Sequence, residues 1–241
     1  MAIDDPWTCD EASICVDAVV SQLARSNVLM RYVSLTTERA LARCGSCRRG
    51  RGRPQRCTGW DLRVDPPLTF RQVDMRGTAL RVELSGVFRY SRSTAAGWVD
   101  WKERPLSECS AAISVVHVED DSRARNHLDL ANRGQAGTVW HLQLGGGSID
   151  KAPRWATYLR WPALPLDFAL ACELILFNFY PDEWIKVRGG NPWREWIQRS
   201  ENLVLSHYRD RFTDYWDRRD RLASWLSAQC NQTANWDPRA T

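Results

Sequence analysis

Three cysteines in an arginine-rich stretch have the spacing of metal ligands. Cys44 and Cys47 are two residues apart, as in a zinc knuckle, and Cys57 can close a loop onto the same ion. Thiolates at this spacing both point inward and bind Zn²⁺ at about 2.3 Å. The fourth ligand has to come from outside the stretch, from a histidine or from one of three cysteines, Cys9, Cys15 and Cys109. The sequence leaves two interpretations open, a zinc site and a set of reduced, unligated cysteines.

The same stretch has the composition of a nucleic-acid contact. Residues 43–57 contain six arginines, three glycines and no acidic residue. The segment Arg51-Gly52-Arg53-Pro54 resembles the core of an AT-hook, where glycine lets the backbone enter the narrow minor groove and arginines meet its negative potential. The resemblance implies nucleic-acid binding by five arginines, Arg48, Arg49, Arg51, Arg53 and Arg56. The alternative is an exposed, solvated loop.

Two other patterns favour a metal-dependent enzyme. Glu83 with Asp100 and Lys102 supplies two acids and a lysine, a set that can bind Mg²⁺ and orient a water in a nuclease. Three histidines fall on consecutive predicted strands, where two of them can face each other as a metal or acid–base pair: His117, His127 and His141. The alternatives are surface ion pairs and structural histidines. The common hydrolase, nucleotide-binding and zincin motifs are absent from the sequence.

Composition narrows the class of protein. The 241 residues are 44% hydrophobic, which is enough for one large core, and we expect a single domain. All but three of the 33 basic residues are arginine, but a net charge of +4 does not by itself indicate nucleic-acid binding. The acidic N-terminus lacks a secretory pattern, so we expect a cytoplasmic location and reduced cysteines. The longest apolar run, residues 164–180, is too short and too interrupted by polar residues for a membrane span, so we expect no membrane association.

The first half of the chain predicts a helical layer followed by a sheet. Residues 10–24 have the spacing of an amphipathic helix, and a second short element extends this layer to residue 42. Residues 43–58 form the arginine- and cysteine-rich loop. An antiparallel sheet is predicted within residues 59–147. Its four strands are expected as a meander at residues 80–90, 111–118, 125–132 and 138–144.

The second half, residues 163–230, is predicted to be helical. Pro165 begins a buried apolar helix that Pro181 ends. Asn191 and Pro192 then start a helix that runs to about residue 228, long enough that it either kinks or offers a surface to a second chain. Thirteen tryptophans favour core packing, with base stacking or partner binding as the alternative. The residues predicted to bind a partner are Tyr208, Phe212, Tyr215, Trp216 and Trp225.

The order of these elements, a helix, a four-stranded meander and then helices, resembles ubiquitin-conjugating (E2-like) and RWD folds. HLQLGGGSID, followed by WPALPLDFALACELILFNFYPDEW, also resembles the bacterial E2-like proteins. That family places its catalytic cysteine after the glycine-rich turn, whereas this chain has no cysteine between Cys109 and Cys172. Cys172 lies within the predicted buried helix and is a poor substitute. The resemblance therefore implies a non-catalytic, adaptor-like member.

The sequence as a whole predicts an α+β fold, with a four-stranded antiparallel meander packed against N-terminal and C-terminal helices. The predicted function is a non-catalytic adaptor subunit of an intracellular, bacterial assembly. It would contact DNA or RNA through the arginine-rich loop, and a protein partner or a second copy through the aromatic C-terminal helix. The alternatives are a metal-dependent enzyme acting on nucleic acid and a structural homodimer.

Overall fold

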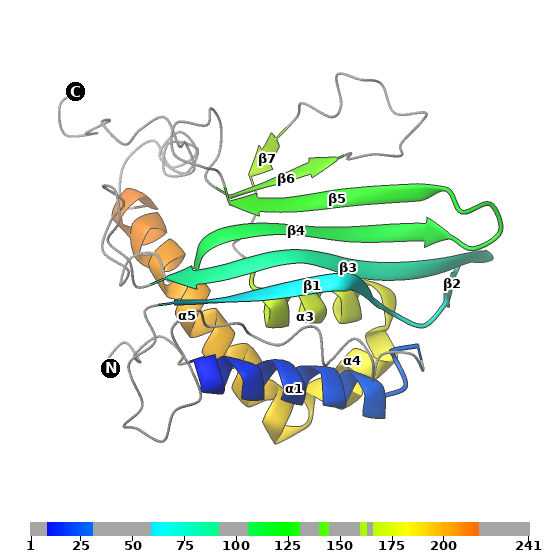
Figure 1. The fold of residues 1–241 in the computed structure, drawn as a ribbon, viewed down its shortest axis with the longest axis horizontal. Helices are drawn as coiled ribbons and strands as arrows, with labels where there is room; N and C mark the ends of the chain where they lie inside the picture. The colour runs from blue at the N-terminus through cyan, green and yellow to red at the C-terminus, as the bar shows by residue number, and fades with distance from the viewer. Residues whose placement is uncertain are drawn as a thin grey trace.

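The computed structural model describes residues 9–30, 59–91, 106–130, 140–144, 160–162 and 166–216. These residues form an antiparallel sheet of seven strands with helices on one side (Figure 1). The predicted α+β class and antiparallel meander are confirmed.

The sheet contains the four predicted strands in the predicted order, together with three more. Neighbouring strands follow the order β1, β3, β4, β5, β6, β7, and β2 pairs with β3. The predicted number of strands, four, was therefore too low. The bounds are Gly59–Thr69 for β1, Val73–Met75 for β2, Thr78–Ser91 for β3, Leu106–His117 for β4, Arg123–Leu130 for β5, Trp140–Leu144 for β6 and Arg160–Pro162 for β7.

The strand β1 lies at the edge of the described sheet and contains two consecutive prolines. Pro66 and Pro67 fall where the register of β1 against β3 shifts, between Val64 and Leu68. Proline has no backbone N–H to donate, so within sheets it is confined to edges and bulges. The prolines weaken the strand pattern in the sequence, yet they fit an irregular edge strand.

One correction concerns the helical layer predicted at the N-terminal end of the fold. The helix α1, Cys9–Arg25, fits the first predicted helix. The second element was expected to be helical from residue 28, but Val28 to Met30 are extended and Leu29 forms an antiparallel bridge with Phe70. Asn27, with φ of 56°, turns the chain out of α1. Residues 31–42 lie outside the described part of the chain.

The buried helix α3, Phe168–Phe179, begins at Asp167, whose side chain accepts the Leu170 N–H at 3.0 Å. The helix ends at Phe179, just before Pro181, as predicted, and Pro181 itself lies in the first turn of a further helix, α4, Pro181–Arg188. Proline suits that position because the first helical N–H groups have no intrahelical acceptor. The last described helix, α5, spans Asn191–Trp216, and residues 217–241 lie outside the described part. None of the described helices is both long and apolar enough to cross a membrane.

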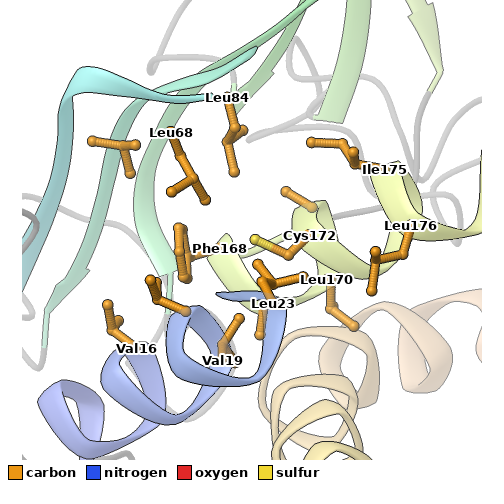
Figure 2. Close-up of a cluster of buried hydrophobic side chains, with 14 of the residues drawn as sticks. Val16, Val19, Leu23, Leu68, Leu84, Phe168, Leu170, Cys172, Ile175 and Leu176 are labelled. Atoms are coloured by element: carbon orange, nitrogen blue, oxygen red, sulfur yellow. The ribbon is translucent and has the colours of Figure 1, made fainter. Parts of the chain in front are cut away.

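The core lies between the helices and one face of the sheet. The helix α3 is its centre, with Phe168, Leu170 and Cys172 buried among side chains from the sheet above and from α1 below (Figure 2). Phe168 also meets Phe88 of β3 edge to face, with ring centroids 6.2 Å apart. Most of α3 is buried, as its sequence predicted, whereas Leu174, Phe177 and Asn178 on its outer side are exposed.

Candidate functional site on the open face of the sheet

The alternation of side chains along β3 gives the sheet two different faces. Val82 and Leu84 are fully buried against the helical layer, so Arg81 and Glu83 between them point to the other side. We call that second side the open face, because the helices pack on the opposite face (Figure 1). From the strand register, its members with described side chains are Arg63 and Thr69 on β1; Arg81, Glu83, Ser85, Val87 and Arg89 on β3; Ser110, Ala112, Ser114 and Val116 on β4; and Arg123, Arg125 and His127 on β5.

The open face carries both arginines and acidic residues. By register, five arginines on β1, β3 and β5 share it with four acidic positions, Glu83, Asp61, Glu108 and Asp129. The register pairs Arg89 with two acidic positions, Asp61 on β1 and Glu108 on β4. At the other end of the strands, Arg81, Arg123 and Arg125 lie near one carboxylate, that of Glu83, beside a β4–β5 turn that carries three further acids.

Glu83 lies between two of these arginines. Its Oε1 is 3.2 Å from Arg81 Nε, and its Oε2 is 3.5 Å from Arg123 Nη1. The Glu83 side chain is 12% exposed, compared with 28% for Arg81 and 41% for Arg123. The carboxylate therefore lies deeper than the two guanidinium groups and links β3 to β5 across β4.

Arg125 is different, because no hydrogen bond or ion pair joins it to the described residues. Its Nε is buried without a hydrogen-bond partner, and its register neighbour on β4 is Ser114. Arg123 lies on the same strand face only two residues away, about 7 Å along the strand. Two like charges at this spacing repel each other, so an anion bound between them would relieve the repulsion.

None of the three histidines is the direct strand partner of another. His117 is opposite Leu80, His127 is opposite Gln143 and Ala112, and His141 is opposite Asp129. The His117 Nδ1 lies 2.7 Å from Asp120 Oδ1. Hydrogen bonds from Ser122, and then from His117, lower the pKa of Asp120 below its usual value. Within the described residues, no group of three or more histidines, cysteines and acids is placed to hold a metal ion.

The predicted nuclease set is not assembled by the described residues. Glu83 is already paired with two arginines, which compete with any cation for its oxygens. Asp100 and Lys102 lie outside the described part of the chain. So do the predicted zinc ligands and AT-hook residues: Cys44, Cys47, Cys57, Arg48, Arg49, Arg51, Arg53 and Arg56.

The cysteines with described side chains, Cys15, Cys109 and Cys172, are buried thiols. Burial, and then the nearby Asp167 carboxylate, raises the pKa of the Cys15 and Cys172 thiols far above its ordinary value. The thiolate, which is the nucleophile and metal ligand, is thus disfavoured at both positions. Cys172 lies inside the buried helix as predicted.

The helical side carries a separate group of polar and aromatic contacts. Glu173 accepts the indole N–H groups of Trp184 and Trp193 at 2.7 and 2.5 Å. The Trp184 ring also meets Phe177 edge to face at 5.1 Å and lies 4.9 Å from the Arg188 guanidinium carbon. Together these contacts join α3, α4 and α5.

Some apolar side chains on this helical side remain exposed. Phe177 on α3 is 56% exposed and Ile185 on α4 is 64% exposed, with Leu174 at 37%. Of the predicted partner-binding residues, Tyr208, Phe212, Tyr215 and Trp216 belong to α5, but their side chains lie outside the described part. Trp225 lies outside it entirely.

A comparison of the chain with family models, curated proteins and solved structures finds no match. The E2-like and AT-hook resemblances therefore stay predictions. The open face was missed by sequence reasoning, although a signal was present. Arg81, Glu83 and Arg89 alternate with buried residues in the strand LRVELSGVFRY, and Arg123 and Arg125 are two residues apart on β5.

Proposed function

We propose that the protein is a non-catalytic binding subunit whose open face binds the phosphate backbone of single-stranded nucleic acid. The observation that carries the proposal is the set of five arginines on one face of the sheet, of which Arg125 has no described partner. Arginine suits this role because its planar guanidinium group binds phosphate with two parallel hydrogen bonds and also stacks on bases.

The shape of the face favours a single strand over a duplex. Reading a duplex requires an element that enters a groove, such as a helix or a two-stranded ribbon. The open face is instead a sheet surface with arginines on β1, β3 and β5, which flank the buried β4 residues Ala112 and Ser114. An extended strand can lie on such a surface with its phosphates on the arginines.

The proposal keeps a second nucleic-acid contact in the arginine-rich stretch. Residues 43–58 lead directly into β1, which itself contributes Arg63 to the open face. Arg51 and Arg53 would then extend the basic surface along the chain. In this proposal a zinc ion on Cys44, Cys47 and Cys57 would fix that stretch next to the sheet.

A protein partner on the helical side completes the adaptor function. Exposed Phe177 and Ile185 support partner binding there, in addition to the predicted aromatic residues of α5. Large apolar side chains that stay exposed together are typical of interaction sites. Phe177→Ser with Ile185→Ser should abolish binding to the partner, or the concentration-dependent mass of a homodimer in sedimentation, and should leave nucleic-acid binding unchanged. A loss of nucleic-acid binding in this variant would contradict the separation of the two surfaces.

The nucleic-acid proposal is tested by fluorescence anisotropy across a salt series. The probes are labelled single-stranded DNA, single-stranded RNA and duplex DNA, each about 12 nucleotides long, within the site sizes of single-strand binders. The proteins are wild type, Arg125→Ala and Arg194→Ala. Arg194 is the matched control, because it is an exposed arginine on α5 and its removal changes the charge equally.

We expect wild type to prefer single strands and to lose affinity steeply with salt, because each phosphate contact contributes about 0.7 to the logarithmic slope. Arg125→Ala should weaken binding about tenfold, the loss of one charged hydrogen-bonding contact. Arg194→Ala should change it less than about twofold, since a distant exposed charge is screened. Equal effects of the two substitutions would refute the proposal.

A further inference from the structure

Glu83 is the carboxylate that the proposed phosphate-binding face places among its arginines. From its charge alone, Glu83 should weaken the binding of nucleic acid, since a negative group repels a polyanion. The geometry points to the opposite role. We infer that Glu83 is a positioning residue, which holds Arg81 and Arg123 ready on both sides of β4 to bind one backbone phosphate. This inference rests on the proposed function.

The two carboxylate oxygens hold different arginines. Oε1 meets Arg81 Nε at 3.2 Å, and Oε2 meets Arg123 Nη1 at 3.5 Å. Each guanidinium group has five N–H donors, so these contacts leave most donors available. Because both arginines are more exposed than Glu83, those donors lie nearer to solvent than the carboxylate does. A phosphate arriving from solvent meets the guanidinium groups first and does not need to displace Glu83.

The strand register puts both arginines in one row. Val116 of β4 is the partner of Arg81 on one side and of Arg123 on the other, and it is fully buried. The two arginine backbones are thus about 10 Å apart, two strand spacings, with a small apolar residue between them. Side chains as long as arginine can meet at one anion above Val116.

Positioning in advance matters because arginine is flexible. A free arginine side chain loses rotamer freedom when it binds, and fixing it beforehand removes part of that loss from the binding free energy. Arg81 is also restrained from the β4–β5 turn, where Asp121 Oδ1 lies 3.8 Å from Arg81 Nη2. Glu83 supplies the restraint that Arg81 and Arg123 share.

Positioning and simple charge predict opposite signs for one substitution. Glu83→Gln removes a negative charge but keeps the side-chain length, so charge alone predicts tighter binding of a polyanion. If Glu83 positions the arginines, the same change weakens binding, because a neutral amide holds two guanidinium groups less firmly. Glu119→Gln is the matched control. It removes the same charge from an exposed residue of the β4–β5 turn.

The experiment measures binding of the full chain to a labelled single-stranded oligothymidylate of about 12 nucleotides across a salt series. We expect Glu83→Gln to weaken binding about threefold to tenfold with a shallower salt slope, and Glu119→Gln to bind as tightly as wild type or more tightly. Glu83→Asp, which keeps the charge, should restore part of the loss. Binding by Glu83→Gln as tight as that of Glu119→Gln would overturn the inference.

The two proposals fail in different ways. If Arg125→Ala weakens binding but Glu83→Gln does not, the face binds nucleic acid and only the positioning role is wrong. If Arg125→Ala binds like Arg194→Ala, the proposed function is wrong and the positioning role falls with it. Should Glu83→Gln fail to fold, an Arg81→Lys/Arg123→Lys variant tests the same claim. This variant keeps both positive charges but lacks the planar guanidinium groups, so it should also weaken binding. Unchanged binding would overturn the inference.

Discussion

Two carboxylates, one on each side of the sheet, each lie between two nitrogen donors. They differ in how many N–H groups these donors keep available for a further ligand. On the helical side, Glu173 accepts the single indole N–H groups of Trp184 and Trp193 at 2.7 and 2.5 Å. On the open face, Glu83 has looser contacts, 3.2 and 3.5 Å, with Arg81 and Arg123.

The difference lies in the spare capacity of the donors. An indole has one N–H, so Trp184 and Trp193 are fully used once they bind Glu173, and Trp193 is buried. A guanidinium group has five, so Arg81 and Arg123 can bind Glu83 and a ligand together. The same kind of side chain thus joins helices on one side and, in our proposal, prepares a binding surface on the other.

The largest expected effect is on the covered face. Phe88→Ala should lower the free energy of unfolding by about 3–5 kcal/mol, because it leaves a cavity beside Phe168 in the core. Arg125→Ala on the open face should change it by less than about 1 kcal/mol, because Arg125 is only partly buried and has no described partner to lose. Urea denaturation measures both. Similar losses in the two variants would break the division of the sheet into a structural face and a binding face.

The next effect tests how closely β3 and β4 approach. Gly86 has φ of 137°, and a Cβ there would overlap the Ser110 carbonyl oxygen and lie 2.5 Å from Ala111 Cα. Gly86→Ala should therefore cost about 2–3 kcal/mol, through backbone strain and overpacking. Thermal unfolding checks this value. A control substitution, Gly77→Ala, has open space for the new methyl group, so its cost should come from its φ of 81° alone and be smaller.

The two carboxylates should respond in opposite ways to the same substitution. Glu173→Gln should lower the free energy of unfolding by about 1–3 kcal/mol, because an amide accepts only one of the two indole N–H groups. It should leave oligonucleotide binding unchanged. Glu83→Gln should cost at most about 1 kcal/mol, the range of partly exposed ion pairs, and should weaken binding. Weaker oligonucleotide binding by Glu173→Gln would show that the two sides are coupled.

Alkaline pH should lower the free energy of unfolding through two buried cysteine thiols on the helical side of the sheet. The pKa values of the Cys15 and Cys172 thiols are raised by burial, so below the ordinary thiol pKa, near 9, their contribution to stability is complete. Above it, the unfolded thiols ionise first and stability falls, by about 1.4 kcal/mol per thiol at about pH 10. Urea denaturation from about pH 7 to 10 should show a flatter dependence in Cys15→Ala. An equal dependence in that variant would contradict the assignment.

The fold could be predicted where the hydrophobic pattern within a single strand or helix identifies that element. The alternation of Val82, Leu84 and Phe88 identifies β3, and the apolar residues of α3 identify a buried helix. Pro181 marked the end of α3 as predicted, but the sequence did not predict that the same proline starts α4. The edge strand β1, with Pro66 and Pro67 at its irregularity, was also not predicted as a separate strand.

The candidate site was harder to predict, because it depends on strand register. The sequence shows Arg81 and Glu83 two residues apart, and Arg123 and Arg125 likewise. It does not show that Arg123 lies across β4 from Arg81, because a shift of one residue would turn either strand's arginines toward the core. The contact of Glu83 with Arg123 follows only from that register.

The most direct test of the central claim observes the arginines themselves. The Nε–Hε resonances of the full chain are recorded by NMR during titration with a single-stranded oligothymidylate of about 12 nucleotides. Our proposal predicts that the signals of Arg81, Arg123 and Arg125 shift with saturation, while those of Arg188 and Arg194 on the helical side stay in place. Shifts confined to the helical side, or no shifts at all, would contradict binding at the open face.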